Sequence, residues 1–470
     1  MQTVARTFTA ADVEAFAAAS GDWNPAHVDP LAARRLIAGG PIVHGLHALL
    51  WALDGAAAGP GLARVRCTFR QPVRVGERAT ATPHTGGDGT LEIAIQSGGR
   101  DALEAAVEWG PAQPEVAVRT APARAEPELL TADDIASAQG ALDVASGDLH
   151  ALLPGLAGRL SAGALAALVS VSRLVGMQCP GRFSILRALD LRFDGAAPGP
   201  TLRWRVLRFD PRFSSVRIGV EAGGFEGTVD AFLAPAPSVQ PGTADLGALV
   251  ERGAFADARA LVVGGSRGLG EVAAKLLAAG GADVRVTYRD GVRDAGRVCD
   301  DIRAAGFRAE PRRLDVLDPE APAGLGGWRP SHLLYFATPH IALAESARFS
   351  AELFRRYGAY YVEGFVRLVE AIAADGAPLA AFYPSTAALD EIQPKALEYA
   401  SAKAAGEAAC RHLERLYPRL RVEVIRLPRV RTDATATVMP VEAAEAATVM
   451  RDVLRRLRAA PRAEDTAAPR

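Results

Sequence analysis

The sequence predicts two different folds in one chain: an α+β part in which a sheet wraps around a long helix, and an α/β part with a doubly wound parallel sheet. Two observations lead to this division. The order of predicted elements in residues 1–110 recurs in residues 129–234. From residue 259 onward, short apolar strands alternate with helices, which is typical of a parallel sheet covered by helices on both faces.

The composition indicates a globular protein and excludes several functions. Of the 470 residues, 49% are hydrophobic and the formal net charge is −1, so buried cores are expected and a nucleic-acid partner is not. The four cysteines form no CxxC pair, which argues against a zinc site or a disulfide framework and indicates a reducing cytoplasm. No apolar run is long enough to span a membrane, and no secretion signal is evident. We therefore expect a cytoplasmic protein without a metal, membrane or nucleic-acid partner.

Two stretches rich in proline and alanine are predicted linkers. One covers residues 110–128, and the other lies in residues 235–250. They separate a first segment (1–110), a second (129–234) and a third (251–460). Each of the first two segments begins with a short helical stretch, continues with a longer apolar helix and ends in strand-like runs, so we interpret them as two halves of one duplicated domain.

The first candidate site is the stretch SGDWNPAH, which interrupts a predicted helix. Pro25 disfavours the helical conformation of the residue before it, so the helix in ADVEAFAAA must end here. Asp22 and His27 could be a helix cap and a core residue, but His44 and Gly45 lie in the next apolar helix. A glycine there lets a substrate approach closely, and N–H groups at a helix N-terminus could stabilise a negative thioester oxygen.

This region resembles the MaoC-like (R)-specific enoyl-thioester hydratases, which have the hotdog fold. The family motif S-G-D-x-N-P-x-H is intact here, and the stretch FRQPVRVGE is also similar. The resemblance covers about 110 residues and implies a double hotdog with Asp22 and His27 as the catalytic pair. Asn24 would position them, and His44 and Gly45 would lie at the oxyanion. Removing water from a 3-hydroxyacyl thioester needs one base and one acid, and the pair can exchange these roles.

A shorter version of the motif, SGDLH, occurs in the second segment. Its Asp148 and His150 are only two residues apart, and the Asn-Pro pair is missing. We therefore predict a degenerate half that contributes to packing and to the tunnel for the acyl chain. The alternative is a second active site.

The third segment opens with ALVVGGSRGLGE, a glycine-rich stretch between a predicted strand and a predicted helix. Gly264, Gly268 and Gly270 would allow a tight turn and the close approach of a pyrophosphate to the helix N-terminus. The stretch therefore predicts a dinucleotide-binding Rossmann fold.

The cofactor expected there is NADPH rather than NADH. Arg267 in the loop and Arg289 after the next strand suit a 2′-phosphate, because arginine binds phosphate in a bidentate fork, whereas Asp290 leaves NADH open. Asp315 ends the third strand and could contact adenine. The predicted cofactor-binding set is Gly264, Ser266, Arg267, Gly268, Leu269, Gly270, Tyr288, Arg289, Asp315 and Lys403.

A second candidate catalytic pair is Tyr399 and Lys403, which are four residues apart and so share a helix face. A nearby lysine cation would lower the pKa of the phenol, which could then give a proton to a carbonyl oxygen. With the glycine loop, this pair resembles the short-chain dehydrogenase/reductase superfamily across about 200 residues. The resemblance implies that Tyr399 is the acid and that Lys403 holds the ribose.

The resemblance also implies a hydroxyl upstream of Tyr399 that holds the substrate oxygen, and two residues compete for this role. Thr386 has the usual 13-residue spacing, and Ser385 has the usual identity. The chain departs from the family pattern at YFATP, where an Asn-Asn-Ala-Gly run is usual, and at LPRVRTD, where the family has Pro-Gly. The short stretch before the last helix predicts a small substrate lid.

The sequence therefore favours a bifunctional enzyme that reduces a 3-oxoacyl thioester and dehydrates the product to a trans-2-enoyl thioester, as in fatty-acid or polyketide synthesis. One alternative runs the steps backwards with NAD, as in β-oxidation; another is a non-catalytic acyl-thioester-binding protein. An acyl carrier protein or coenzyme A would carry the substrate. Reductases of this fold usually associate through helices beside the sheet, so a homodimer or tetramer is expected.

Overall fold

The computed structural model describes residues 2–56, 59–341, 349–391, 393, 395–438 and 441–459. The chain divides into two compact units. The first unit contains Met1–Ala236 with Thr437–Pro440, and the second contains Pro237–Ala436 with Val441–Arg470. Each unit has its own sheet and its own buried core.

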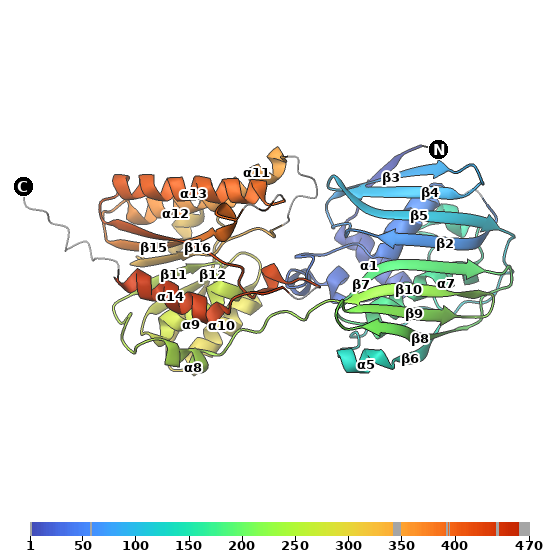
Figure 1. The fold of residues 1–470 in the computed structure, drawn as a ribbon, viewed down its shortest axis with the longest axis horizontal. Helices are drawn as coiled ribbons and strands as arrows, with labels where there is room; N and C mark the ends of the chain where they lie inside the picture. Colours follow the sequence, from blue (N-terminus) through green and yellow to red (C-terminus); the bar gives the residue numbers. More distant parts are fainter. Residues whose placement is uncertain are drawn as a thin grey trace, which may run out of the picture. The chain divides into compact units, whose positions relative to one another are not determined.

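The sheet of the first unit has ten antiparallel strands, and their order shows the predicted duplication. The order is β1-β3-β4-β5-β2-β7-β10-β9-β8-β6, so the second five strands repeat the first five in reverse (Figure 1). The halves join where β2 pairs with β7, with Cys67 opposite Leu189. The strands are β1 (Val4–Thr7), β2 (Gly61–Phe69), β3 (Arg78–Thr85), β4 (Leu91–Ser97), β5 (Arg100–Gly110), β6 (Gln139–Asp143), β7 (Ser184–Phe193), β8 (Thr201–Asp210), β9 (Ser215–Glu221) and β10 (Phe225–Leu233). This confirms the predicted double hotdog.

Each half has one long apolar helix, as expected. These are α4 (Gly45–Asp54) and α7 (Ala162–Arg173), and α7 continues as a π-helix, η1 (Leu174–Gln178). The apolar stretch before α4 does not join the helix, because the N–H of Val43 donates to the carbonyl of Val73. The shorter helices are α1 (Ala10–Ser20), α2 (Pro25–Val28), α3 (Pro30–Ala33), α5 (Ala132–Ala136) and α6 (Pro154–Ala157).

The first helix of each half begins with the same capping arrangement. The hydroxyl of Thr9 and the carboxylate of Asp12 form a capping box for α1, and Thr131 and Asp134 do the same for α5. The predicted linker of residues 110–128 is held along the first unit, because Gln113 donates to the carbonyl of Leu62 at 2.6 Å.

The second unit contains a parallel sheet of six strands in the order β13-β12-β11-β14-β15-β16. The chain order reverses between β11 and β14, which is the switch point of a Rossmann fold. The strands are β11 (Arg259–Val263), β12 (Asp283–Tyr288), β13 (Arg308–Arg313), β14 (His332–Tyr335), β15 (Leu379–Thr386) and β16 (Leu420–Leu427). This confirms the predicted doubly wound sheet.

Helices cover both faces of this sheet (Figure 1). One face carries α9 (Gly268–Ala279), α10 (Val292–Ala304) and α14 (Ala446–Ala459). The other carries α11 (Ala351–Gly358), the π-helix η4 (Ala359–Glu363), α12 (Gly364–Ala373) and α13 (Leu397–Leu416). The remaining helices are α8 (Thr243–Leu246) and the 3₁₀ turns η2 (Gly247–Leu249), η3 (Ala321–Leu325), η5 (Ala387–Leu389) and η6 (Asp433–Thr435).

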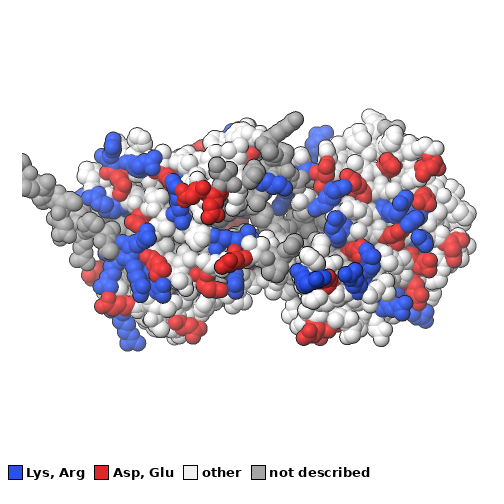
Figure 2. All heavy atoms as spheres, viewed as in Figure 1, with Lys and Arg blue, Asp and Glu red and all other residues white. Residues whose placement is uncertain are grey.

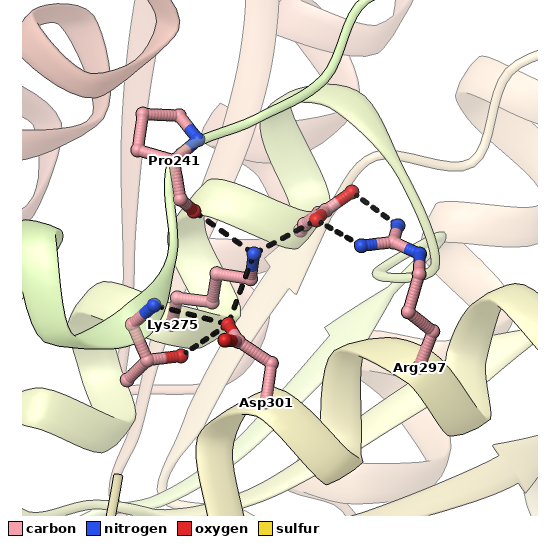
Figure 3. Close-up of polar contacts among 6 residues, drawn as sticks. Pro241, Lys275, Arg297 and Asp301 are labelled. Carbon is pink, nitrogen blue, oxygen red and sulfur yellow. Dashed lines mark hydrogen bonds and ion pairs between the residues drawn. The ribbon is translucent and has the colours of Figure 1, made fainter. Parts of the chain in front are cut away.

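A buried ion network fixes the segment that precedes β11 (Figure 3). The Lys275 side chain is 2% exposed, and its Nζ lies 2.9 Å from Glu271 and 3.1 Å from Asp301. Nζ also donates to the carbonyl of Pro241 at 2.9 Å. Arg297 pairs with Glu271 through both of its terminal nitrogens. Part of the predicted linker 235–250 is therefore attached to the second unit.

On the face shown in Figure 2, acidic and basic side chains are intermixed on both units. All four cysteines are buried and free. Within the described ranges, no helix has both the length and the apolar character needed to cross a membrane.

Candidate active sites

Asp22 follows directly on the end of α1 and is almost completely buried. The Ser20 hydroxyl accepts a hydrogen bond from the Asp22 N–H at 3.1 Å and donates to the carbonyl of Phe16 at 2.7 Å, which turns the chain out of the helix. Asp22 is 2% exposed. Its Oδ2 accepts a hydrogen bond from the Ser172 hydroxyl at 2.7 Å, and its Oδ1 accepts one from the Asn24 N–H at 3.3 Å.

Burial raises the pKa of the Asp22 carboxyl, because a carboxylate is poorly solvated there. The charge of His27, the Ser172 hydroxyl, the Asn24 N–H and the charge of Arg173 act in the opposite direction. Asp22 thus lies in an apolar environment that contains specific groups stabilising its ionised form.

Asn24 and His27 lie at the start of α2, as the motif implies. Asn24 caps this helix, since its Oδ1 accepts from the Ala26 N–H at 2.9 Å. The Asn24 Nδ2 donates to the carbonyl of Gly176 at 2.7 Å, which is in the second half. His27 Nδ1 lies 2.9 Å from the carbonyl oxygen of Ile42. A carbonyl can only accept, so Nδ1 carries a proton, which leaves Nε2 as the ring nitrogen available for proton transfer.

His44 and Gly45 lie beside this pair, at the N-terminus of α4. His44 is the N-cap residue and Gly45 is the first helical residue. The His44 Nε2 donates to the backbone carbonyl of Asp22 at 3.0 Å, and its ring stacks on that of His27 with 3.8 Å between centroids. Burial lowers the pKa of His44 well below its usual value, so this ring is neutral.

The ligating atoms of Asp22, His27 and His44 lie within 4.8 Å of one another. This spacing would also suit a metal ion. Both Asp22 oxygens and the His44 Nε2 already have hydrogen-bond partners in the protein. We therefore treat the group as an acid–base cluster.

The shortened motif of the second half does not repeat this arrangement. Asp148 and His150 are both exposed, and Asp148 Oδ1 accepts a hydrogen bond from the backbone N–H of His150 at 2.9 Å. The second half contributes to the first site through Ser172 and Gly176 instead. A Cβ at Gly176 would lie 2.1 Å from Asp22 Oδ1, so only glycine fits there.

Sequence reasoning missed Ser172, Arg173 and Gly176. The available signal was the polar Ser-Arg pair at the end of an otherwise apolar helix. Nothing in the local sequence connects these residues to Asp22, which lies about 150 positions earlier.

In the second unit, the glycine loop has the shape that a dinucleotide requires. It runs from the end of β11 to the start of α9, with Arg267 as the N-cap residue. Gly264 has a φ of +76°, and a Cβ there would lie 2.9 Å from the carbonyl carbon of Phe336. A Cβ at Gly270 would lie 2.3 Å from the oxygen of Gly264. Because the glycines carry no side chain at these close contacts, the backbone can make the tight turn and approach a pyrophosphate at the N-terminus of α9. The residues therefore fit the expected cofactor.

The other predicted cofactor-binding residues lie around this loop. Ser266 lies in the loop, Gly268 and Leu269 begin α9, Tyr288 ends β12, and Asp315 follows β13. Arg289 Nη1 donates to the Tyr360 hydroxyl at 2.6 Å, and its Nε donates to Asp290 at 2.7 Å. Arg267 lies 3.9 Å from Asp433. Both guanidinium groups therefore have acidic or hydroxyl neighbours in this structure.

The two candidate hydroxyls near Tyr399 have different partners. The side chains of Tyr399 and Thr386 are hydrogen-bonded to each other. The Ser385 hydroxyl instead donates to Glu407 at 2.6 Å, and Glu407 is paired with Arg426. Successive residues of a strand point to opposite faces, which separates the two hydroxyls. The structure thus brings together Tyr399 and Thr386.

Lys403 is held by a carbonyl and by aromatic rings. It is 6% exposed, and its Nζ donates to the carbonyl of Pro384 at 2.6 Å. The same nitrogen lies 3.9 Å from the ring centroid of Tyr361 and 5.1 Å from that of Tyr383. Burial lowers the pKa of Lys403 to about 7.

The expected effect of Lys403 on Tyr399 is wrong for this structure. Burial raises the pKa of Tyr399, and only the hydrogen bond with Thr386 opposes this. The physical reason is that the ammonium group is bonded to Pro384 and lies over the ring of Tyr361. The stretch YFATP also contributes here, because Thr338 is hydrogen-bonded to the Tyr361 hydroxyl at 2.7 Å.

Comparisons with known proteins agree with this picture for the first unit. The family model of the MaoC like domain matches residues 1–96, which confirms the resemblance seen in the motif. An (R)-specific enoyl-CoA hydratase from Aeromonas caviae is 40% identical over 85 residues, which are 17% of this chain and 62% of the relative. The chain therefore spans about three fifths of that relative's length.

Solved structures also match this chain. A short-chain dehydrogenase from Burkholderia cenocepacia J2315, in complex with NADP, is 24% identical with a TM-score of 0.39, covering 43% of this chain and 91% of that protein. A 3-oxoacyl-[acyl-carrier protein] reductase from Brucella melitensis, with bound NAD, is 20% identical with a TM-score of 0.40, covering 47% and 90%. The strand order of the second unit by itself shows its Rossmann topology.

Proposed function

We propose that the chain is a bifunctional enzyme of acyl thioesters. The second unit reduces a 3-oxoacyl thioester with NADPH, and the first unit dehydrates the (R)-3-hydroxyacyl product to a trans-2-enoyl thioester. The observation that carries this proposal is the cluster of Asp22 and His27, a buried carboxylate and an imidazole with a free Nε2 in an intact hydratase motif. The similarity to an enoyl-CoA hydratase supports an acyl thioester as substrate.

The chemistry of dehydration fits two such groups. One of them takes the proton from the α-carbon, and the other gives a proton to the leaving hydroxyl, so that water departs and a double bond forms. The roles are exchanged when water is added. The neutral ring of His44 adds no charge beside His27. The backbone N–H groups at the start of α4 would stabilise the thioester oxygen as it becomes negative.

Reduction would take place at the second unit. The glycine loop and the N-terminus of α9 would hold the pyrophosphate of NADPH, and Arg267 and Arg289 would hold its 2′-phosphate. When bound, this cofactor supplies a hydride. Tyr399 and Thr386 would hold the substrate carbonyl oxygen, and the Tyr399 phenol would give it a proton.

The deciding experiment uses the full chain with a series of 3-oxoacyl thioesters on coenzyme A and on acyl carrier protein, with NADPH or NADH, followed by mass spectrometry. We expect the thioester to gain two hydrogen atoms as the 3-oxo group becomes a 3-hydroxy group, and then to lose one molecule of water. Hydration of an enoyl thioester followed by oxidation with NAD would instead indicate the degradative direction. A chain that converts neither 3-oxoacyl thioesters nor enoyl thioesters would contradict the proposal.

We also propose that the chain forms a homodimer or tetramer, and light scattering would measure its molecular mass in solution.

One observation favours a second candidate for the second unit. Ser385 is bonded to Glu407 and Lys403 to the carbonyl of Pro384, so neither is directed at Tyr399 in this structure. A Rossmann unit that binds a nucleotide or acyl thioester without reducing it would have these features. In that case the enzyme would hydrate enoyl thioesters while 3-oxoacyl thioesters remained unchanged.

A further inference from the structure

We propose that Ser172 and Arg173, which belong to the second half of the first unit, are positioning residues that fix Asp22 and determine the pH range in which it works. The inference rests on the proposed role of Asp22 in dehydration. It assigns a task to the second half, whose own motif residues Asp148 and His150 are exposed.

The contacts between the halves are concentrated at the catalytic carboxylate. The Ser172 hydroxyl donates to Asp22 Oδ2 at 2.7 Å, and Ser172 is 5% exposed. The backbone at Gly176 lies so close to the carboxylate that a Cβ would be 2.1 Å from Oδ1. The carbonyl of Gly176 also accepts from Asn24. The second half therefore forms one wall of the site of the first half.

Arg173 places a buried positive charge behind the motif. It is 5% exposed. Its guanidinium donates to the carbonyl of Asp143, to the carbonyl of Ser20 at 3.5 Å and to the Ser170 hydroxyl at 3.5 Å. The backbone that Arg173 binds at Ser20 is the end of α1, two residues before Asp22. Burial lowers the pKa of Arg173, and the charges of Asp143 and Asp22 oppose this; the charge of Arg173 in turn favours the ionised form of Asp22.

Three charged or titratable side chains face Asp22. They are His27 from α2, His44 at the start of α4, and Arg173 from α7. His44 is neutral because of its burial, and His27 is the catalytic partner. Arg173 is thus the permanent charge in this set, because a guanidinium does not lose its proton in a protein.

These polar residues are not explained by packing alone. Every residue of α7 from Gly163 to Arg173 is buried, and a buried hydroxyl or guanidinium is costly unless it has partners. Ser172 finds its partner in Asp22, and Arg173 is shared between the carbonyls of Asp143 and Ser20 and the Ser170 hydroxyl. A purely structural role would require only that each polar group has a hydrogen-bond partner. These two residues in addition favour the ionised form of the Asp22 carboxyl.

The test is the pH profile for hydration of a short trans-2-enoyl-CoA by the full chain. Removing a group that favours the ionised form raises the pKa of Asp22. If the carboxylate is the active form, the acid limb of kcat moves to higher pH; if the protonated form is active, the alkaline limb moves to higher pH. We expect Ser172→Ala to move the Asp22 limb upward by about one pH unit, because its hydroxyl bonds the carboxylate directly, and Arg173→Met to move it in the same direction by less.

Two further variants separate this role from a loss of folding. Ser172→Thr keeps the hydroxyl and should restore the parent profile. Ser161→Ala removes the N-cap hydroxyl of the same helix, which donates no bond to Asp22, and should leave the profile unchanged even if it lowers the melting temperature. If Arg173→Met does not fold, the comparison of Ser172→Ala with Ser172→Thr decides.

The inference fails if the profiles of Ser172→Ala and Arg173→Met coincide with that of the parent, or move to lower pH. This failure is distinct from that of the proposed function. If the parent hydrates the thioester and Asp22→Asn does not, only the role of Ser172 and Arg173 is overturned. If the parent does not hydrate any enoyl thioester, both proposals fall.

Discussion

The two candidate sites differ in how their titratable groups are held. In the first unit, Asp22 accepts hydrogen bonds on both oxygens, and His27 is oriented by a backbone carbonyl. In the second unit, Tyr399 is bonded to Thr386, but the buried ammonium of Lys403 is held by one carbonyl and two aromatic rings. The first cluster is complete within the protein, whereas the second has its proton donor in place and its lysine engaged elsewhere. If the second unit reduces a carbonyl as proposed, the bound cofactor would therefore have to complete its site, whereas the first site is complete without one.

The largest expected effect is that of Asp22→Asn, which keeps the shape of the side chain and removes its charge. Loss of this acid–base group should slow dehydration by about 10²- to 10⁴-fold. Reduction should continue, so the 3-hydroxyacyl thioester accumulates. Chiral analysis of this product shows whether the second unit makes the enantiomer that the first unit would dehydrate. An (S) product, or no product, would contradict the sequential pathway, because hydratases of this kind act on the (R) alcohol.

Tyr399→Phe is the matching change in the second unit. It removes the proton donor but keeps the ring, which contacts the rings of Tyr357 and Tyr361. Reduction should fall by about 10²- to 10⁴-fold, while interconversion of enoyl and 3-hydroxyacyl thioesters is unchanged. Both rates are measured with the same preparation. Normal reduction by this variant would favour a different proton donor.

A pair of variants tests which hydroxyl serves Tyr399. Thr386→Ala removes the partner of the phenol, so reduction should fall by about 10²-fold. Ser385→Ala removes a donor to Glu407 on the other face of the strand, and should reduce the rate much less. Steady-state kinetics with a 3-oxoacyl thioester compares them. The opposite ranking would place Ser385 at the substrate.

Arg289→Asp tests the cofactor preference. Without the guanidinium, NADPH should bind about tenfold more weakly, and NADH should be spared or improved. Arg293→Asp makes the same charge change at an exposed position of α10 and serves as the control. Calorimetric titration with each nucleotide gives the affinities. If the parent protein binds NADH as tightly as NADPH, the assignment of Arg267 and Arg289 is wrong.

The smallest effect is expected from replacing both Asp148 and His150 by alanine. Both side chains are exposed, and Asp148 is bonded only to a neighbouring N–H in the same turn. Dehydration should stay within a few-fold of the parent rate, measured beside a melting curve. A loss as large as that of Asp22→Asn would show a second active site in this half.

The local parts of both sites were predictable from the sequence. Asp22, Asn24 and His27 lie within six residues, and the broken helix predicts that the carboxylate and the imidazole approach the substrate from one side. The partners that determine their properties were not predictable, because Ser172 and Gly176 approach Asp22 from a distant part of the chain. In the second unit the spacing of Thr386 and Tyr399 was informative. The direction in which the Lys403 side chain points was not predictable, since it depends on the packing of Tyr361 and Tyr383.

The ion network around Lys275 determines where the chain can be cut. A fragment of the second unit that starts at residue 251 would lose Pro241, which accepts from Lys275, and Thr243, which donates twice to Asp301. The remaining charges would stay buried with fewer partners, which destabilises a folded protein. A protease that cleaves before Pro237 would leave the network whole. The segment that joins the two units is therefore shorter than its proline-rich composition indicates, and its second part folds with the second unit.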